Sequence, residues 1–295
     1  MASIQETRHG QLACLDITLG DAHLRVARQG AQVLSYQRGQ DAPIIWLSPL
    51  DEGRPGTACR GGIPVCWPWF GQFDRNPAAI VQQYQGAKAP QHGLVRNQDW
   101  QLANTEQSNN SVVLRFAAPQ QFVNWPHRAA LSLEIELNDR LQLRLINQNL
   151  GEQPLHISQA LHSYFQVGNI HQAQAEGFAD CQYLDTVHSW DNRLTQRGAI
   201  TFDGETDRIY FNPQRQMGIT DPVLNRRIVL STTGASAAVV WNPWIDKSKQ
   251  LSQFPEQGWQ QMLCIETANV LDSHLILAPG EQQQMAVTIE AQPLA

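Results

Sequence analysis

The chain has 295 residues, of which 42% are hydrophobic and 16% charged, and its formal net charge is −6. This composition supplies enough apolar material for a sizeable core and excludes a disordered, highly charged chain. The modest negative charge argues against general affinity for nucleic acids or anionic membranes, although it leaves room for a local basic pocket. No linker divides the sequence, so we predict a single domain over residues 1–295.

The N-terminal residues and the cysteines indicate the compartment. The first residues, MASIQETRHGQLACL, contain no basic segment followed by an apolar one, and no apolar run in the sequence is long enough to span a bilayer. Five cysteines without a CxxC pair are typical of reduced thiols rather than of a disulfide framework or a zinc ribbon. We therefore expect a cytoplasmic protein without a structural metal.

Short segments of alternating apolar and polar residues recur along the chain. The first covers 23–37, and the clearest covers 131–150, where apolar residues share one face on both sides of a turn at Asn138-Asp139. The second segment therefore predicts a β-hairpin. Many strands without a long helical period predict an all-β fold, either a large sandwich or a barrel. Similar segments cover 111–119, 226–234, 237–244, 260–270 and 282–292.

Two irregular segments lie between the first strands and the hairpin. In CRGGIPVCWPWFGQF, residues 59–73, glycines, prolines and aromatic residues follow one another too closely for a central strand. The aromatic residues could simply fill an edge of the core. Arg60 beside Gly61-Gly62 suits an anion or a polyhydroxylated ring, because a guanidinium offers a planar fork of donors. The second segment, APQHGLVRNQDW, supplies Gln91, His92 and Arg96.

One face of the segment HISQALHSYFQVG, residues 156–168, collects groups that exchange hydrogen bonds or protons. At period two, apolar residues occupy one side, and His156, Ser158, His162 and Tyr164 occupy the other. A lone histidine in a strand is usually structural. The polar face nevertheless makes His162 a candidate for proton transfer.

Glu266, in QQMLCIETANV, shares its strand face with Met262 and Cys264, and no residue on that face carries a positive charge. We expect its carboxylate to be partly desolvated, which raises its pKa and makes it a better base. The alternative is a solvated glutamate at a strand end. A metal site formed with His156 and His162 is a further alternative, although no other ligand at a usual spacing accompanies the two histidines.

Five motifs together resemble one enzyme family. CRGGIPVCWPWFG, QHGLVRN, ALHSYFQVG, TDRIY and CIET occur in the order seen in hexose-6-phosphate mutarotases, also called glucose-6-phosphate 1-epimerases, of the aldose 1-epimerase-like superfamily. Each motif is weak alone, but five in order over nearly the whole chain make a specific match. The resemblance implies a galactose-mutarotase-like β-supersandwich of large antiparallel sheets, with the site in a cleft on a concave face.

The resemblance also implies roles for particular residues. His162 is similar to the catalytic acid of the family and Glu266 to its catalytic base. Anomer interconversion needs only a base for the C1 hydroxyl and an acid for the ring oxygen, so a carboxylate and an imidazole on opposite sides of the hemiacetal require no cofactor and no metal. The positions that resemble the substrate-binding residues are Arg60, Gln91, Arg96 and Asp207, and His92 is a weaker candidate.

The motifs favour a glucose-6-phosphate 1-epimerase, and three alternatives remain open. A mutarotase of unphosphorylated aldoses would have no use for two arginines. A non-catalytic carbohydrate-binding protein would not require both an acid and a base, and a glycoside hydrolase would normally need paired carboxylates. Without the motif, Asp207 beside Arg208 would be interpreted as a surface ion pair. We expect a monomer that binds a small hexose phosphate, and neither nucleic acid nor membrane.

Overall fold

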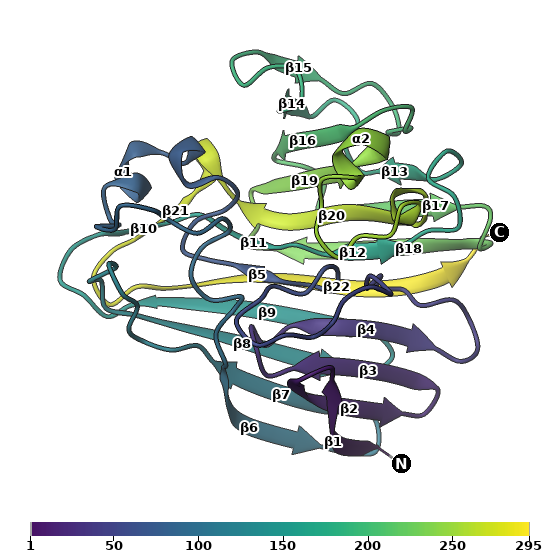
Figure 1. The fold of residues 1–295 in the computed structure, drawn as a ribbon, viewed down its shortest axis with the longest axis horizontal. Coiled ribbons are helices and arrows are strands. Elements are labelled where there is room, and N and C mark those ends of the chain that lie inside the picture. The colour runs from purple at the N-terminus through teal and green to yellow at the C-terminus, as the bar shows by residue number, and fades with distance from the viewer. Residues whose placement is uncertain (1, 295) are drawn as a thin grey trace.

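The computed structural model describes residues 2–294 and consists mostly of antiparallel strands (Figure 1). The predicted all-β class is confirmed. No helix within the described residues has the length and apolar character needed to cross a bilayer. The helical segments are short: α1 (Ala78–Val81), α2 (Trp244–Ser248), η1 (Phe73–Arg75), η2 (Gly258–Gln261) and η3 (Leu271–Ser273).

The strands form four sheets. A four-stranded sheet has the order β1 (Ser3–His9), β2 (Leu12–Leu19), β3 (Ala22–Ala27), β4 (Val33–Arg38). An eight-stranded sheet, the long sheet, has the order β13 (Gln174–Glu176), β17 (Gln216–Asp221), β18 (Arg226–Thr233), β22 (Gln282–Pro293), β9 (Leu141–Asn149), β8 (Ala129–Leu137), β7 (Val112–Ala117), β6 (Gln101–Gln107). A second eight-stranded sheet, the cleft sheet, has the order β15 (Arg193–Thr195), β14 (Gln182–Asp185), β16 (Thr206–Phe211), β19 (Ala237–Asn242), β20 (Met262–Asn269), β11 (Gln159–Leu161), β5 (Val65–Cys66), and β12 (Tyr164–Gln166) also pairs with β20. The last sheet joins β10 (Leu155–Ile157) to β21 (Leu275–Leu277).

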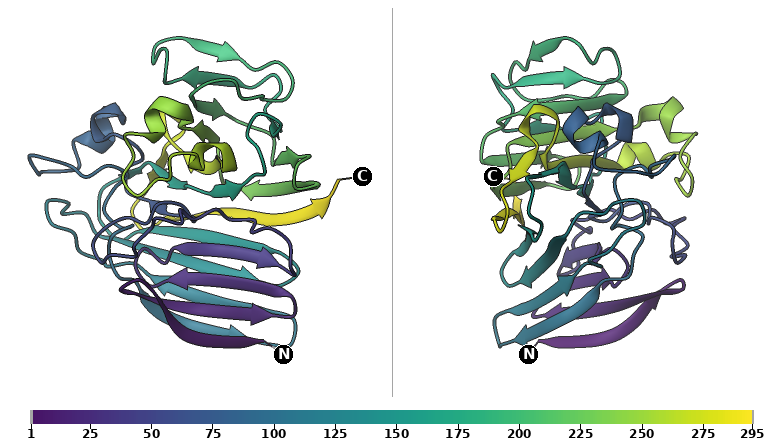
Figure 2. Two further views of the ribbon diagram at one scale, coloured as in Figure 1. Left: turned by 45° about the vertical axis from the view of Figure 1, so that its right-hand side comes forward. Right: turned by 90° about the vertical axis from the view of Figure 1, so that its left-hand side faces the viewer.

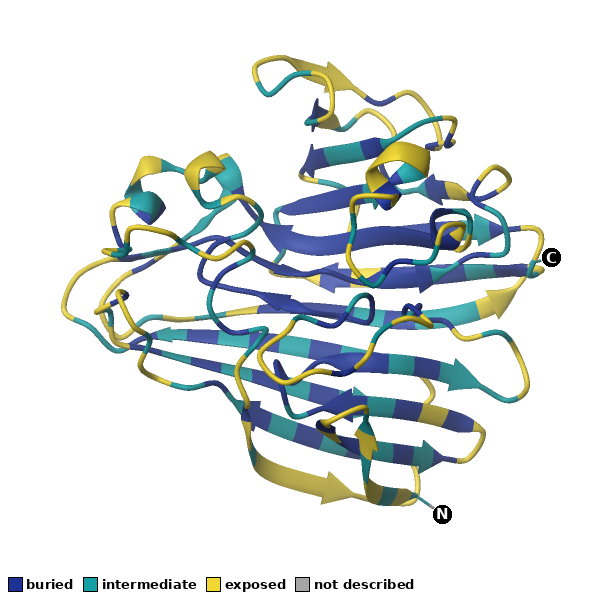
Figure 3. Ribbon diagram, in the orientation of Figure 1, coloured by how far each residue is buried: buried dark blue, intermediate teal, exposed yellow. Residues whose placement is uncertain are grey.

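The predicted hairpin is formed by β8 and β9. Leu137 pairs with Leu141, so the connecting loop covers 138–140 and is one residue longer than the predicted turn. Buried and partly exposed residues alternate along both strands, as the banding in Figure 3 shows. This alternation is the consequence of a strand with one face on the core, because successive side chains point to opposite sides.

The sheets pack in layers and share the largest cluster of buried hydrophobic residues. The four-stranded sheet lies against the part of the long sheet made by β6–β9 (Figure 2). Leu24 of β3 and Leu133 of β8 belong to the same buried cluster as Ile228 of β18 and Ile265 of β20. Burying each such side chain contributes roughly 1.5–3 kcal/mol. The core therefore extends beneath the cleft sheet and supports it from one side.

The segment 156–168 differs from the predicted continuous strand. It forms β10, β11 and β12, and the first pairs with β21 while the other two pair with β20. The chain changes partner strand at Ser158, whose backbone N–H donates to the Pro68 carbonyl at 3.0 Å. A period-two pattern shows which side a residue faces but not which strand lies beside it, so this change of partner could not be predicted from the sequence.

Candidate active site

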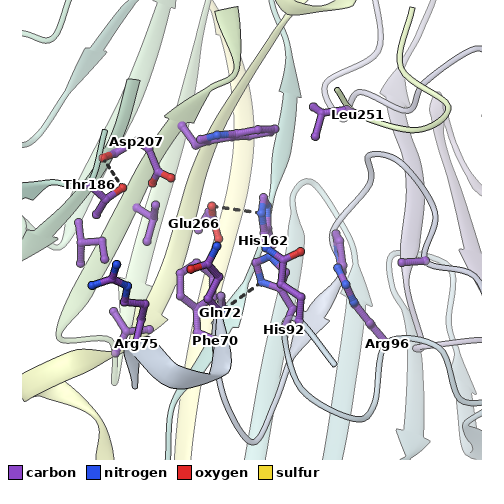
Figure 4. Close-up of a pocket in the computed structure, with 18 of the residues that line it drawn as sticks. Phe70, Gln72, Arg75, His92, Arg96, His162, Thr186, Asp207, Leu251 and Glu266 are labelled. Atoms are coloured by element: carbon purple, nitrogen blue, oxygen red, sulfur yellow. Dashed lines mark hydrogen bonds and ion pairs between the residues drawn. The ribbon is translucent and has the colours of Figure 1, made fainter. Parts of the chain in front are cut away.

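A cavity of about 800 Å³ opens over the cleft sheet (Figure 4). It is lined by residues from the strands β16, β19 and β20 and from the loops around β5. All of the candidate site residues lie at this cavity, as does the weaker candidate His92: Arg60, Gln91, Arg96, His162, Asp207 and Glu266. The structure thus brings together every position that the motifs identified.

The interruption between β11 and β12 places His162 against Glu266. Both strands pair with β20 in the same register, so His162, in the gap between them, lies directly opposite Glu266. The gap is a tight turn in which the Ser163 N–H donates to the Leu161 carbonyl at 2.9 Å. His162 Nε2 lies 3.3 Å from Glu266 Oε1. A turn within one strand therefore sets the imidazole beside the carboxylate.

Both groups are buried and incompletely satisfied. Glu266 is 1% exposed and His162 is 8% exposed. Burial, and then the charge of Asp207, raises the pKa of Glu266 well above its ordinary value, which is the direction that the sequence predicted. Burial, and then the charge of Arg96, lowers the pKa of His162 to about 3. His162 Nδ1 and Glu266 Oε2 are buried and have no hydrogen-bond partner among residues 2–294.

Arg60 reaches the cavity from a loop that only glycine can form. Gly61 and Gly62 have φ values of 120° and 73°, in the region that favours glycine. A Cβ on Gly61 would collide with the Trp46 carbonyl, and one on Gly62 with the Val33 carbonyl. The two glycines therefore allow the loop to pack closely against neighbouring backbone and hold Arg60 at the cavity.

Arg96 comes from a second loop that docks on the first. Gly93 forms an isolated β-bridge with Trp67. A side chain at this glycine would collide with the Trp67 backbone. In the same loop, His92 Nδ1 accepts a hydrogen bond from the Gly71 N–H at 3.3 Å. Burial lowers the pKa of Arg96, and no carboxylate within residues 2–294 pairs with its guanidinium. A desolvated arginine without a partner suits an anionic ligand, because the ligand would compensate its lost hydration.

Asp207 lies on the cleft face of β16 and is not the partner of Arg208. The two side chains point to opposite faces of the strand, and Arg208 Nε lies 3.3 Å from Asp185. The alternative of an Asp207–Arg208 surface ion pair is therefore wrong. Burial raises the pKa of Asp207 to about 6. Thr186 Oγ1 donates to the Asp207 backbone carbonyl at 3.0 Å and ties β16 to the end of β14.

The aromatic residues of the cavity were only partly foreseen. Trp67 and Trp69 are fully buried, in agreement with the interpretation that the aromatic residues of this segment fill the core. Phe70, in contrast, lines the cavity. Trp241 on β19 was missed, although its ring lies 6.1 Å from that of His162 in an edge-on arrangement. The alternation in 237–244 places Trp241 on a strand face but does not show that this face borders the cleft.

His156 lies away from the cavity. Its Nδ1 contacts His274 Nε2 at 3.0 Å, beside the pairing of β10 with β21. The alternative of a metal site made by His156, His162 and Glu266 is therefore wrong. Among residues 2–294, no group of three or more His, Cys, Asp or Glu side chains is arranged to hold a metal ion.

Comparison with known proteins identifies the family. Residues 15–290 match the family "Aldose 1-epimerase". A relative from Escherichia coli K12, named "Putative glucose-6-phosphate 1-epimerase", is 34% identical over 245 residues, which cover 82% of this chain and 78% of the relative. A crystal structure of a "putative mutarotase" from Salmonella typhimurium superposes with a TM-score of 0.87 at 27% sequence identity. The match covers 98% of this chain and 94% of the Salmonella chain.

A more distant structure defines the fold. The crystal structure of a galactose mutarotase-like protein from Clostridium acetobutylicum has a TM-score of 0.73 at 14% identity. The match covers 100% of this chain and 99% of the Clostridium chain. The predicted galactose-mutarotase-like fold is thus confirmed. Since the family match extends over nearly the whole sequence, the chain belongs to the aldose 1-epimerase family and is an isomerase.

Proposed function

We propose that this enzyme interconverts the α and β anomers of hexose 6-phosphates, as a glucose-6-phosphate 1-epimerase. Glu266 is the catalytic base and His162 the catalytic acid. The observation that carries the proposal is the order of the polar groups across the cleft sheet. The substrate-binding residues are Arg60, Gln91, Arg96 and Asp207.

The groups across the sheet follow the order of the groups around a pyranose 6-phosphate. Asp207 is on β16 and Glu266 is two strands further on β20. His162 follows in the gap between β11 and β12, opposite Glu266. Arg60 and Arg96 belong to the loops beside β5, and Figure 4 shows Arg96 and Asp207 on opposite sides of the acid–base pair. Around the sugar, the C2 hydroxyl is followed by the C1 hydroxyl, the ring oxygen, and C5 with its phosphate-bearing C6. If the two orders are superposed, the phosphate would lie at the arginines, which supports the proposal.

The close contact between His162 and Glu266 suits chemistry at one carbon. The C1 hydroxyl and the ring oxygen are bonded to the same atom, so a base and an acid that lie side by side can serve both oxygens without standing on opposite sides of the hemiacetal. Glu266 takes the hydroxyl proton while the bond from C1 to the ring oxygen breaks, and His162 gives a proton to that oxygen. After rotation about C1–C2, the reverse transfers close the ring on the other face.

A phosphate at the two arginines would also act on the acid. Beyond the larger effect of burial, the charges of Arg96 and Arg60 lower the pKa of His162. A phosphate dianion bound to both guanidinium groups would offset these charges, so the pKa of the imidazole would rise and it would become easier to protonate. The substrate's phosphate would then contribute to turnover as well as to binding.

The proposal is tested by anomer exchange, measured by NMR on glucose, galactose, glucose 6-phosphate and mannose 6-phosphate with one enzyme sample. We expect the phosphorylated sugars to be preferred in kcat/KM, because hydrogen bonds to a charged partner contribute roughly 1.5–3 kcal/mol each. Arg60→Ala and Arg96→Ala should reduce this preference, and inorganic phosphate should compete. Arg54→Ala is the control, since Arg54 is exposed in the same loop and pairs with Glu52 outside the cavity.

Equal activity on glucose and glucose 6-phosphate would contradict the phosphate assignment. It would favour a mutarotase of unphosphorylated aldoses, which uses the same acid–base chemistry. We further infer from the sequence that the enzyme is a cytoplasmic monomer that acts on a small molecule and binds neither nucleic acid nor membrane. Sedimentation equilibrium would test the monomeric state, and cell fractionation would test the cytoplasmic location.

A further inference from the structure

A third arginine lines the cavity at the end opposite Arg60 and Arg96. Arg75 ends the turn η1, and its guanidinium carbon lies 5.1 Å from the centre of the Trp190 ring. Trp190 is in the connection between β14 and β15, beyond the strand that carries Asp207. In Figure 4, Arg75 lies on the Asp207 side of the acid–base pair, whereas Arg96 lies on the other side. The cavity therefore has cationic groups at both ends.

The Arg75 side chain is free to bind, while its backbone is held. Within residues 2–294 its guanidinium forms no ion pair, and its neighbour on the cavity side is the Trp190 ring. The Asn76 side-chain amide donates to the Phe70 carbonyl at 2.8 Å and to the Gln72 carbonyl at 2.9 Å, which fixes the loop. The cation–π contact with Trp190 restrains the side chain further. Arg75 is exposed at the cavity, and all its guanidinium donors remain available to a ligand.

The proposed orientation of the sugar brings C2 and C3 to this end. With the phosphate at the β5 edge and C1 at Glu266, the ring continues through C2 to C3 in the direction of β16 and β14. Asp207, on β16, is nearer to the base and suits the C2 hydroxyl. Arg75 lies further out, and its free donors suit the C3 hydroxyl. We propose that Arg75 is a specificity-determining residue that donates hydrogen bonds to the C3 hydroxyl of the hexose, an inference that rests on the proposed function.

A different role for Arg75 would be general attraction of anions to the cavity mouth, where Lys247 is also exposed. Such attraction would be equal for all hexose 6-phosphates and would weaken with salt. A hydrogen bond instead depends on the hydroxyl itself. The two roles are therefore separated by a substrate that lacks only the C3 hydroxyl.

The experiment compares glucose 6-phosphate with 3-deoxyglucose 6-phosphate in anomer exchange. The parental enzyme should prefer the first. Arg75→Met keeps an apolar side chain against Trp190 but removes the donors, so kcat/KM for glucose 6-phosphate should fall roughly tenfold. The value for the 3-deoxy substrate should change little, and the preference should disappear. Arg75→Lys keeps the charge without the planar fork and should restore only part of the preference.

Arg215→Met is the matched control, because Arg215 is exposed and lies outside the cavity, and it should change neither value. Melting curves will show that each variant is folded. Equal losses on both substrates, or a loss that vanishes at high salt, would overturn the C3 contact. The same comparison with glucose and 3-deoxyglucose is independent of the phosphate. A preference that Arg75→Met abolishes there would support the C3 contact even if the phosphate assignment were wrong.

Discussion

Replacing Glu266 by glutamine should remove most of the activity and stabilise the fold. The carboxylate is buried on β20, and its Oε2 has no hydrogen-bond partner among residues 2–294. Burial raises its pKa, so the ionised form is less favourable in the folded chain than in the unfolded one. Glutamine keeps nearly the same shape without the charge, so it relieves this cost while it removes the base.

The stabilisation should depend on pH with a defined sign. Because the folded-state pKa of Glu266 is raised, the folded chain keeps the proton at pH values where the unfolded chain has lost it. The cost is therefore absent below the unfolded pKa, about 4.3, and increases as the pH rises through the folded pKa. A pKa raised by one unit corresponds to about 1.4 kcal/mol of cost for the ionised form. We expect the substitution to recover about 1–2 kcal/mol at neutral pH, which raises Tm by roughly 2–4 °C for a chain of this size.

Calorimetry at pH 7.5 and at pH 4.5, together with anomer exchange on glucose 6-phosphate, measures both effects. Turnover should fall by ~10²–10⁴-fold, and the gain in Tm should be present at the higher pH only. Glu256→Gln, at an exposed position, is the control and should leave both unchanged. A variant with near-parental turnover at saturating substrate would show that Glu266 is not the base. A variant that melts no higher than the parent at neutral pH would refute the claim that the buried charge of Glu266 destabilises the folded chain.

His162→Asn should lower turnover by ~10²-fold or more and change KM less, as measured by anomer exchange at saturating substrate; a folded variant with parental turnover would exclude His162 as the acid. The pH profile of kcat/KM should rise with pH through the raised pKa values of Asp207, about 6, and of Glu266. Asp207→Asn should move this rise to lower pH, because it removes a negative charge that raises the pKa of Glu266, and an unchanged profile would contradict that coupling. Activity should survive exhaustive dialysis against a chelator, since an acid–base pair needs no Lewis acid, whereas activity lost and then restored by zinc or manganese would contradict the mechanism.

The parts of the fold that depend on local pattern could be predicted from the sequence. The hairpin of β8 and β9 is one example, because its two strands are neighbours in the chain and its alternation shows directly which side is buried. The division of 156–168 into three strands could not be predicted, since it depends on β20 and β21, about 100 residues further along. Pairings between distant segments are set by tertiary packing, which a period-two pattern does not describe.

The same distinction applies to the site. Glu266 could be predicted to be desolvated because its strand neighbours are apolar, and Arg60 could be predicted to bind an anion or a sugar from the chemistry of its loop. The role of Asp207 followed only from the resemblance. That His162 lies opposite Glu266 depends on the register of β11 and β12 against β20. Arg75 had no signal at all, because it lies in a single turn whose sequence has no period and no motif.

The spacing of charges across the cleft sheet keeps the pKa of Glu266 raised. Burial, and then the charges of Arg96 and Arg60, lower the pKa of His162, whereas the pKa of Glu266 is raised by burial and by Asp207. An arginine in direct contact with Glu266 would stabilise the carboxylate and lower its pKa, which would make it a weaker base. His162 lies one strand closer to β5 and separates the carboxylate from these cations. The strand order thus allows two cations to hold a phosphate while the base keeps its raised pKa.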